Sequence, residues 1–140
     1  MSPSIYQRHL DTIPKQYRLL KLFRPPIYVI ELSNNQVSAV CYYKDSSSKR
    51  YQVNADFSNR RMVIADFLQA IQAMTDLLLK FSRHPFGISS FAVVNVTEEL
   101  IDALTMIEIK AIREAVWAAS GQAKRRIVSS MVSYQGQVVS

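Results

Sequence analysis

The chain has 140 residues, of which 49% are hydrophobic and 20% charged, a balance typical of one globular domain and not of a disordered chain. No apolar run approaches the roughly 20 residues of a membrane span, and the N-terminus lacks the apolar core of a secretory signal, so we expect a cytoplasmic protein. Seventeen Lys and Arg against eleven Asp and Glu leave a net charge of +6, which permits anionic partners without establishing one.

Residues 1–26 form a basic N-terminal segment that ends in the breaker Pro25-Pro26. Pro14 is suited to open a short helix, on which the cations fall at a spacing of three, close to one helical face. Such a helix can lie on a membrane surface or meet another anion, with its apolar side chains at the lipid boundary. The contacts would come from Lys15, Arg18, Lys21, Leu22, Phe23 and Arg24. Alternatively, Leu19, Leu20, Leu22 and Phe23 pack on the domain.

Three short strands follow in the pattern of an antiparallel meander. Residues 27–32 are rich in strand-forming side chains, and Asn34-Asn35 is typical of a turn, because asparagine tolerates the left-handed backbone. Residues 36–43 alternate, with Val37, Ala39, Cys41 and Tyr43 on one face. Residues 45–48 predict a loop and residues 50–53 a third strand.

Residues 63–82 change to helical periodicity. One face would carry Ile64, Phe67, Leu68, Ile71, Met74, Leu78 and Phe81, and the other Asp66, Gln69, Gln72, Asp76 and Lys80. His84-Pro85 is expected to stop this helix. Residues 91–96 are almost continuously apolar, which predicts a central strand buried on both faces.

The last third of the chain predicts two more helices and a final strand. Residues 97–104 suit a short helix that Thr97 opens, and Thr105 with Glu108 fits the capping box of a longer one. Its core face would carry Ile109, Ile112, Val116 and Ala119, and Gly121 is suited to its C-terminal cap. Residues 126–131 predict a strand that the uncharged tail can extend. The order β-β-β-α-β-α-β predicts an α/β fold with a mixed sheet and helices packed on it, as in ribonuclease-H-like domains.

Two blocks of the sequence resemble the first subdomain of the MreB family, the bacterial actin homologues. Residues 63–67 (Val-Ile-Ala-Asp-Phe) are similar to the segment that enters the first long helix of that family. Residues 108–115 (Glu-Ile-Lys-Ala-Ile-Arg-Glu-Ala) and 120–124 (Ser-Gly-Gln-Ala-Lys) are similar to its E-x-R-A-I-R-E-A … A-G-A-K/R helix and exit. Residues 20–24 resemble the basic N-terminal stretch of some members. The resemblance, over roughly residues 20–131, implies that residues 27–140 form a single actin-like ATPase subdomain.

The residues that would grip a nucleotide depart from the family pattern. The first strand of the family ends in Asp-Ile/Leu-Gly-Thr, whereas this chain has Glu31, Leu32, Ser33 and Asn34, without the glycine that lets backbone approach a phosphate. The Glu-Glu-Pro of the family corresponds to residues 129–131 (Ser-Ser-Met), and the sequence ends before a second phosphate loop. The whole chain has 3 glycines, where average usage predicts about ten. We therefore expect a degenerate phosphate loop, no ATPase activity and no cofactor.

A ribonuclease-H-like nuclease is a second interpretation. Such enzymes hold Mg²⁺ with carboxylates on the first strand and the first helix, where this chain has Glu31 and Asp66. The central strand offers Asn95 in place of a further carboxylate. Asp66 equally suits the start of a helix, and Glu31 equally suits a strand end that faces solvent, so we expect neither a metal nor a nucleic-acid partner.

Several single residues have a structural and a functional interpretation. Cys41 is expected to be a buried apolar side chain and not a nucleophile. His9 and His84 have no partner at metal-ligand or triad spacing. Trp117 is expected in or beside the core, or else as an exposed anchor for a partner. Residues 124–126 (Lys-Arg-Arg) predict a solvated approach to the last strand, with an anion site as the alternative.

These observations predict a non-catalytic, MreB-like protein that acts by binding, with a link to bacterial cell shape or the cytoskeleton. Without an opposite lobe, the apolar surface that remains on the sheet and helix layer needs a cover. A second copy of the chain, full-length MreB, or another envelope component can supply it. Peripheral contact with the inner membrane face stays open, as does residual ATP binding, which the glycine count disfavours.

Overall fold

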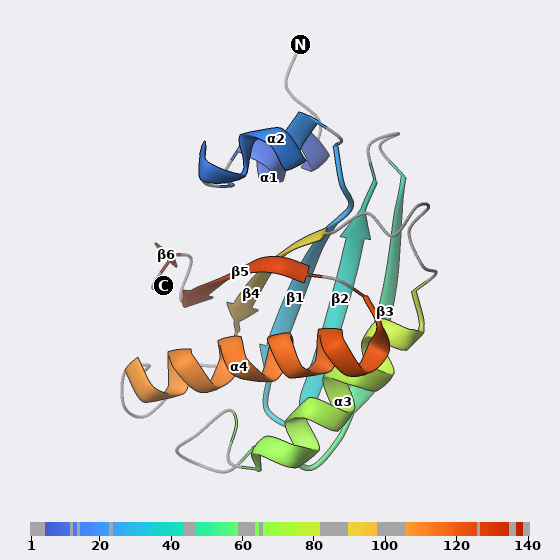
Figure 1. Ribbon diagram of the computed structural model, residues 1–140. Coiled ribbons are helices and arrows are strands. Elements are labelled where there is room, and N and C mark those ends of the chain that lie inside the picture. Colours follow the sequence, from blue (N-terminus) through green and yellow to red (C-terminus); the bar gives the residue numbers. More distant parts are fainter. Residues whose placement is uncertain are drawn as a thin grey trace.

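A six-stranded mixed sheet forms the centre of the molecule (Figure 1). The computed structural model describes residues 5–11, 13, 15–22, 24–43, 47–58, 64, 66–81, 90–97, 106–125, 127–134 and 137–138. The strands are β1 (Ile27–Ser33), β2 (Gln36–Tyr42), β3 (Ser48–Asn54), β4 (Ser90–Val96), β5 (Ile127–Tyr134) and β6 (Gln137–Val138). The uncharged tail thus extends the last predicted strand, while β6 was not predicted.

The strands lie in the order β3-β2-β1-β4-β5-β6. The first three form the predicted antiparallel meander, and β1, β4 and β5 run parallel. An antiparallel meander joined to helix-linked parallel strands in this order is the ribonuclease-H-like arrangement, to which actin-like ATPase subdomains also belong. The predicted fold class is therefore confirmed.

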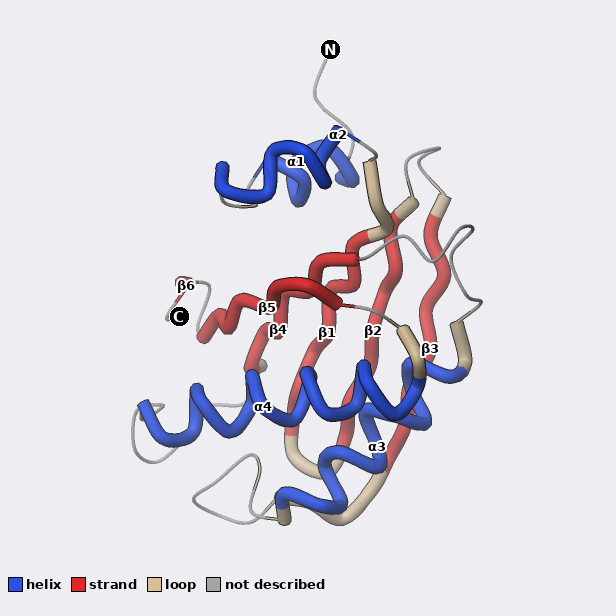
Figure 2. Tube along the Cα trace, in the orientation of Figure 1, coloured by secondary structure: helices blue, strands red, loops and turns tan. Residues whose placement is uncertain are grey.

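Helices lie on both sides of the sheet (Figures 1 and 2). Helix α3 (Phe67–Leu79) and helix α4 (Met106–Ala123) pack on one face, which we call the helix face. On the opposite face, helix α1 (Ile5–Asp11), the 3₁₀ turn η1 (Lys15–Tyr17) and helix α2 (Arg18–Leu22) lie near the start of β1. We call this second, partly covered side the open face.

The main core lies between the helix face and α3 with α4. Alternation along β1 directs Tyr28, Ile30 and Leu32 toward these helices, and all three are buried. The predicted core face of α4 is confirmed, since Ile112, Val116 and Ala119 are buried and Ile109 packs against them; these residues and their counterparts on the strands form one continuous cluster.

The prediction for β4 is correct only for its helix face. Ala92 and Val94 are buried there, but Val93 and Asn95 on the open face are half-buried. The N-terminal helices cover the open face only around Phe91, so the rest of that side of β4 has no second layer among the described residues.

Helix α3 begins later than residue 63. Asp66 is its N-cap, with a side chain that accepts a hydrogen bond from the Gln69 N–H at 3.1 Å. Leu68 was predicted on the core face, but its side chain is exposed to solvent. It lies on the outer side of α3, together with the exposed Gln72, Asp76 and Leu79. Phe67 is likewise partly exposed, so the core face of α3 comes from its later residues.

Helix α4 does not end at Gly121, as predicted, but continues to Ala123. Lys124 takes the left-handed position with φ 55°, and two backbone bonds close the end: Lys124 N–H to the Gly121 carbonyl at 3.3 Å and Arg125 N–H to the Ser120 carbonyl at 3.0 Å. These bonds form a Schellman motif.

The short helix expected after Pro14 is confirmed over residues 15–22, although it begins as a 3₁₀ turn. The chain forms η1 and then a single turn, α2, that ends at Leu22, and Arg24 has φ 47° before Pro25. A residue before proline is disfavoured in the helical region, which explains the early end. Several predictions lie outside the described residues: Pro14, Phe23, the loop at 45–46, His84-Pro85, the helix at 98–104, Thr105 and Arg126.

Candidate functional site

The open face consists of rows of side chains that cross the strands in register. Tyr42, Ile27 and Phe91 form the first row, which the N-terminal helices cover. The second row is apolar and half-buried, and contains Val40, Val29, Val93 and Met131. The third is polar and contains Ser38, Glu31, Asn95 and Ser133, so the predicted Glu31 and Asn95 do lie side by side.

The polar row supplies one carboxylate. Glu31 faces solvent and forms an exposed ion pair with Arg50, with 3.9 Å between its Oε2 and the guanidinium. Asp66 does not join it, because Asp66 caps α3 on the helix face whereas Glu31 points to the open face. Among the described residues no three His, Cys, Asp or Glu side chains are grouped so that they could hold a metal ion. The carboxylate pair that the nuclease interpretation needs is therefore not assembled.

The turn after β1 is a tight hairpin, not an open cradle. Ser33 pairs with Gln36, which leaves Asn34 and Asn35 as the two turn residues. Asn35 has φ 56°, and its side-chain oxygen accepts hydrogen bonds from the N–H groups of Phe57 at 3.0 Å and Ser58 at 2.8 Å. Its own N–H donates to the Ser58 hydroxyl at 3.0 Å. The Asn35 N–H, which a phosphate loop would aim at a ligand, here fastens the hairpin to the chain beyond β3.

Leu32 and Ser33, the middle of the predicted degenerate phosphate loop, also have structural roles. The side chain of Leu32 is buried in the main core, and its carbonyl accepts the Thr97 N–H at 3.0 Å. The Ser33 hydroxyl is 3.5 Å from the Gln36 carbonyl within the same hairpin.

The basic N-terminal segment is fastened to the sheet by a helix that the sequence analysis missed. Tyr6 and Leu10 of α1 pack with Ile13, Ile27 and Phe91 in a second apolar cluster. The Tyr6 hydroxyl donates to the Pro25 carbonyl at 2.7 Å, and burial raises the pKa of Tyr6 to about 12. The apolar residues at positions 6, 10 and 13 were the available signal.

The candidate membrane contacts lie on the outside of this docked segment. Lys15, Arg18 and Arg24 are exposed, and the Arg24 guanidinium lies 5.2 Å from the centre of the Tyr6 ring. Lys21 is half-buried and donates from Nζ to the Ile13 carbonyl at 3.3 Å.

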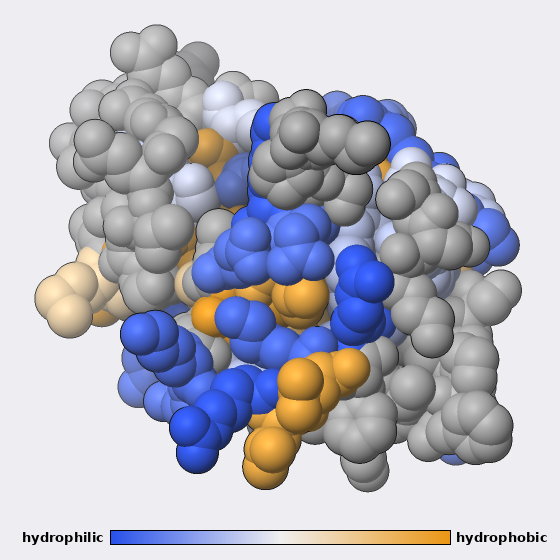
Figure 3. All heavy atoms as spheres, turned by 90° about the horizontal axis from the view of Figure 1, so that it is seen from above, coloured by the Kyte–Doolittle hydropathy of each residue, from blue (hydrophilic) through white to orange (hydrophobic). Residues whose placement is uncertain are grey.

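Two leucines of α2 lie beside these cations. Leu19 is 70% and Leu22 is 78% exposed, so they do not pack on the domain. Seen from the side of the N-terminal helices, hydrophobic surface borders strongly hydrophilic surface (Figure 3). No helix in the described part of the chain is long and apolar enough to cross a membrane.

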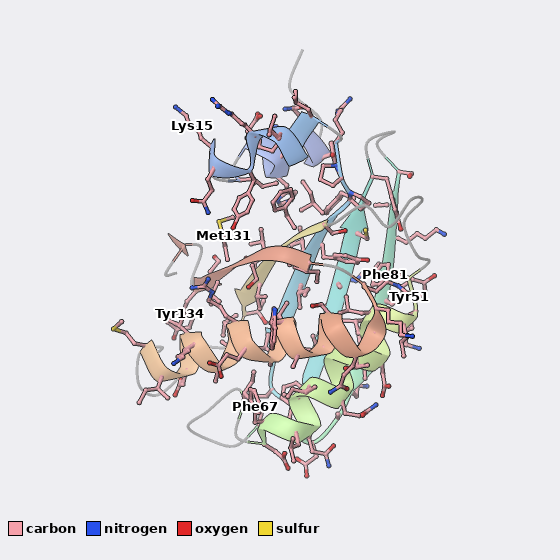
Figure 4. All side chains as sticks on the ribbon, in the orientation of Figure 1. Lys15, Tyr51, Phe67, Phe81, Met131 and Tyr134 are labelled. Carbon is pink, nitrogen blue, oxygen red and sulfur yellow. The ribbon has the colours of Figure 1, made fainter. Side chains whose placement is uncertain are left out.

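Large apolar side chains are exposed on the two helices of the opposite layer. Trp117, expected first in or beside the core, is 75% exposed on the outer side of α4. The others on these helices are Phe67, Leu68, Leu79, Met106 and Ile107; Figure 4 marks Phe67 at the start of α3. On α4, the exposed Lys110, Arg113 and Glu114 lie between Met106 and Trp117.

Arg125 is not part of a solvated approach to β5, as the sequence predicted, but is buried. Its Nε and Nη2 donate to the Phe81 carbonyl at 3.2 and 2.8 Å, and its Nη1 donates to the Ala123 carbonyl at 2.8 Å. The side chain thus joins the chain just after α3 to the end of α4. A hydrophilic run in a sequence does not show that one member turns inward.

Cys41 is buried and His9 is half-buried. Burial raises the pKa of the Cys41 thiol to about 12, so the reactive thiolate is not populated near neutral pH. The His9 ring stacks on Tyr42 with 5.3 Å between the centroids, and burial lowers the pKa of the imidazole. The expectation that Cys41 is a buried apolar side chain is confirmed.

Comparison with known proteins gives a likeness in structure and none in sequence. No protein-family model and no curated protein matches the chain. The chain is similar to the ethanolamine utilization protein EutJ from Carboxydothermus hydrogenoformans, with a TM-score of 0.48 and 13% identity over 83% of this chain and 50% of EutJ. It is also similar to the PPX-GPPA enzyme from Aquifex aeolicus, with a TM-score of 0.38 and 12% identity over 77% of this chain and 36% of that one.

The chain therefore spans about half the length of EutJ and about a third of the Aquifex aeolicus enzyme. The fold class is defined by the strand order and register of this chain itself, as an α/β domain of the ribonuclease-H-like and actin-like type.

Proposed function

We propose that this chain is a non-catalytic binding module that recognises another protein through the outer surface of α3 and α4. The observation that carries the proposal is the exposure of Trp117, together with Met106 and Ile107 on the same helix. Tryptophan is the residue type most enriched among the anchors of protein interfaces. A partner protein that packs on these side chains would remove them from water.

The turn after β1 supports the absence of catalysis. Phosphoryl transfer relies on backbone donors and metal ions held around the phosphates. Here the Asn35 N–H of the hairpin donates to the Ser58 hydroxyl, and Glu31 is the single carboxylate of the polar row. Calorimetry with ATP and Mg²⁺ is expected to give no binding heat, and a micromolar dissociation constant would overturn this part of the proposal.

The partner we propose is an MreB filament, with a role in bacterial cell shape. This choice rests on the resemblance of residues 63–67 and 108–124 to the MreB family. A second copy of the chain is the competing occupant of the same surface, and size-exclusion chromatography with light scattering distinguishes the two.

The decisive experiment measures binding of the purified chain to purified full-length MreB by co-sedimentation. Truncating a hot-spot residue of an interface costs about 2 kcal/mol or more, so Trp117→Ala, as the proposed anchor, is expected to weaken binding about 30-fold while the unfolding midpoint is unchanged. Lys110→Ala, on the same exposed face of α4, is the matched control and is expected to bind normally. A strictly monomeric chain that does not sediment with MreB contradicts the proposal.

A second candidate function is attachment to an anionic membrane surface through α2. The exposure of Leu19 and Leu22 beside Lys15 and Arg18 favours it. Apolar side chains would enter the lipid boundary while the cations meet head groups. Vesicles with 30% anionic lipid are expected to sediment the wild-type chain and to lose the Leu19→Ser/Leu22→Ser variant. Equal binding to uncharged vesicles would argue against it.

A further inference from the structure

The outer edge of β3 is regular, and no other described residue pairs with it. All seven residues pair with β2 without a register shift, from Gln36 with Asn54 to Tyr42 with Ser48. β3 ends the sheet on this side, and within the described part of the chain no element pairs with its other edge. An edge strand of this kind presents backbone N–H and C=O groups to an incoming strand.

Side chains of β3 also pack on the helix face of the sheet. The Tyr51 ring meets the Phe81 ring edge-on, with 4.9 Å between the centroids and 86° between the planes, and Figure 4 shows both where β3 and the end of α3 lie together. Val53 packs against the main core as well. The strand contains no proline or glycine, so its geometry is suited to a further strand.

The charges on β3 select the kind of strand that can join it. Lys49 and Arg50 are exposed and, as neighbours in a strand, point to opposite faces of the sheet. β3 has no acidic residue, and the ion pair from Arg50 to Glu31 is 3.9 Å long and solvent-exposed. Opposite charges on directly paired strand residues are stabilising, and like charges are destabilising.

We propose that β3 is a docking edge for an extended acidic segment of another protein, which adds to the sheet as an antiparallel strand. Main-chain hydrogen bonds would supply affinity, and carboxylates opposite Lys49 and Arg50 would supply specificity. A second copy of β3 is a poor occupant, because it would bring two more cations and no acid to the same edge. This surface is separate from that of Trp117, so the two proposals stand independently.

The probe is a synthetic peptide designed against the sequence from Asn54 back to Ser48: acetyl-Thr-Val-Thr-Ile-Glu-Glu-Thr-amide. In antiparallel register its two glutamates face Arg50 and Lys49. The control peptide carries two lysines in place of the glutamates. Binding is followed by NMR, with amide hydrogen exchange of the β3 residues measured in the free and the saturated protein.

We expect the acidic peptide to bind at least tenfold more tightly than the lysine peptide, and to weaken severalfold between 50 and 300 mM salt. The outward amides of β3 should exchange fast in the free protein and slowly in the complex. The Lys49→Glu/Arg50→Glu variant should reverse the preference between the two peptides. Lys110→Glu/Arg113→Glu, the same charge change on exposed positions of α4, should leave it unaltered.

Three results would overturn the proposal. One is equal binding of both peptides, and another is protection of the outward β3 amides before any peptide is added. The third is peptide binding with unchanged exchange in β3. The Trp117→Ala variant should still bind the acidic peptide, so failure of this proposal is distinguishable from failure of the proposed function.

Discussion

Replacing Arg125 with methionine tests how the ends of the two core helices are joined. Arg125 is 8% exposed, and its guanidinium makes three hydrogen bonds, two to the Phe81 carbonyl and one to the Ala123 carbonyl. Methionine keeps much of the volume but has no donor. Arg125→Met therefore removes the bonds without opening a large cavity.

The expected loss of stability follows from the two carbonyls that lose their donor. A buried acceptor left unsatisfied costs about 1–3 kcal/mol. Part of this is offset, because the buried guanidinium no longer has to leave water and methionine buries apolar surface in its place. We expect Arg125→Met to lower the free energy of unfolding by about 2–3 kcal/mol. Arg125→Lys, which keeps the charge and fewer of the bonds, should lose about half as much.

Urea unfolding followed by circular dichroism measures both variants. At about 3 °C per kcal/mol for a chain of this size, the melting temperature of Arg125→Met should fall by roughly 6–9 °C. Arg113→Met makes the same charge change at an exposed site of α4 and should stay within about 0.5 kcal/mol of the wild type. A loss for Arg125→Met as small as that of Arg113→Met would refute the reasoning.

Three further predictions concern single residues. Lys124→Gly should raise the free energy of unfolding by about 0.5–1 kcal/mol, because φ is 55° at that position and glycine has no Cβ to strain there; a loss in urea unfolding would contradict this. Asn35→Ala removes the acceptor of two backbone N–H groups and should cost about 1–2 kcal/mol, and an unchanged urea midpoint would contradict it. The Cys41 thiol should react with iodoacetamide at pH 8 at least 100-fold more slowly in the native than in the urea-unfolded protein. Its pKa is about 12 when folded and near 9 when unfolded, so its contribution to stability is complete below pH 9 and is lost as pH rises to 12.

The strands could be predicted from the sequence because their alternation has one dominant cause. Residues 36–43 alternate since one side of β2 enters the main core, and the prediction differs from the structure by a single residue at the end. β3 was predicted as four residues and has seven, because its first residues are exposed on both faces and carry no hydrophobic signal.

The N-terminal segment could not be predicted for a different reason. α1 has seven residues, too few to be stable alone, and exists by packing against Ile27 and Phe91, which lie far away in the sequence. The same dependence on distant partners explains Arg125, whose acceptor Phe81 lies 44 residues earlier. Local composition indicated solvent for Arg125, and tertiary contacts decided otherwise.

The blocks that resemble the MreB family have structural roles that account for their presence without a nucleotide. Asp66, in the first block, caps α3. In the second, Ile112 and Ala115 lie in the main core, while Ser120, Gly121 and Lys124 form the closing bonds of α4. None of these described contacts depends on a phosphate, so a sequence that retains them keeps the helices on the sheet whether or not it binds ATP. In the turn after β1, the Asn35 N–H donates to the Ser58 hydroxyl, and the Asn35 side chain accepts the Phe57 N–H. The residues that hold the two helices on the sheet are thus separate from those that fasten the turn after β1.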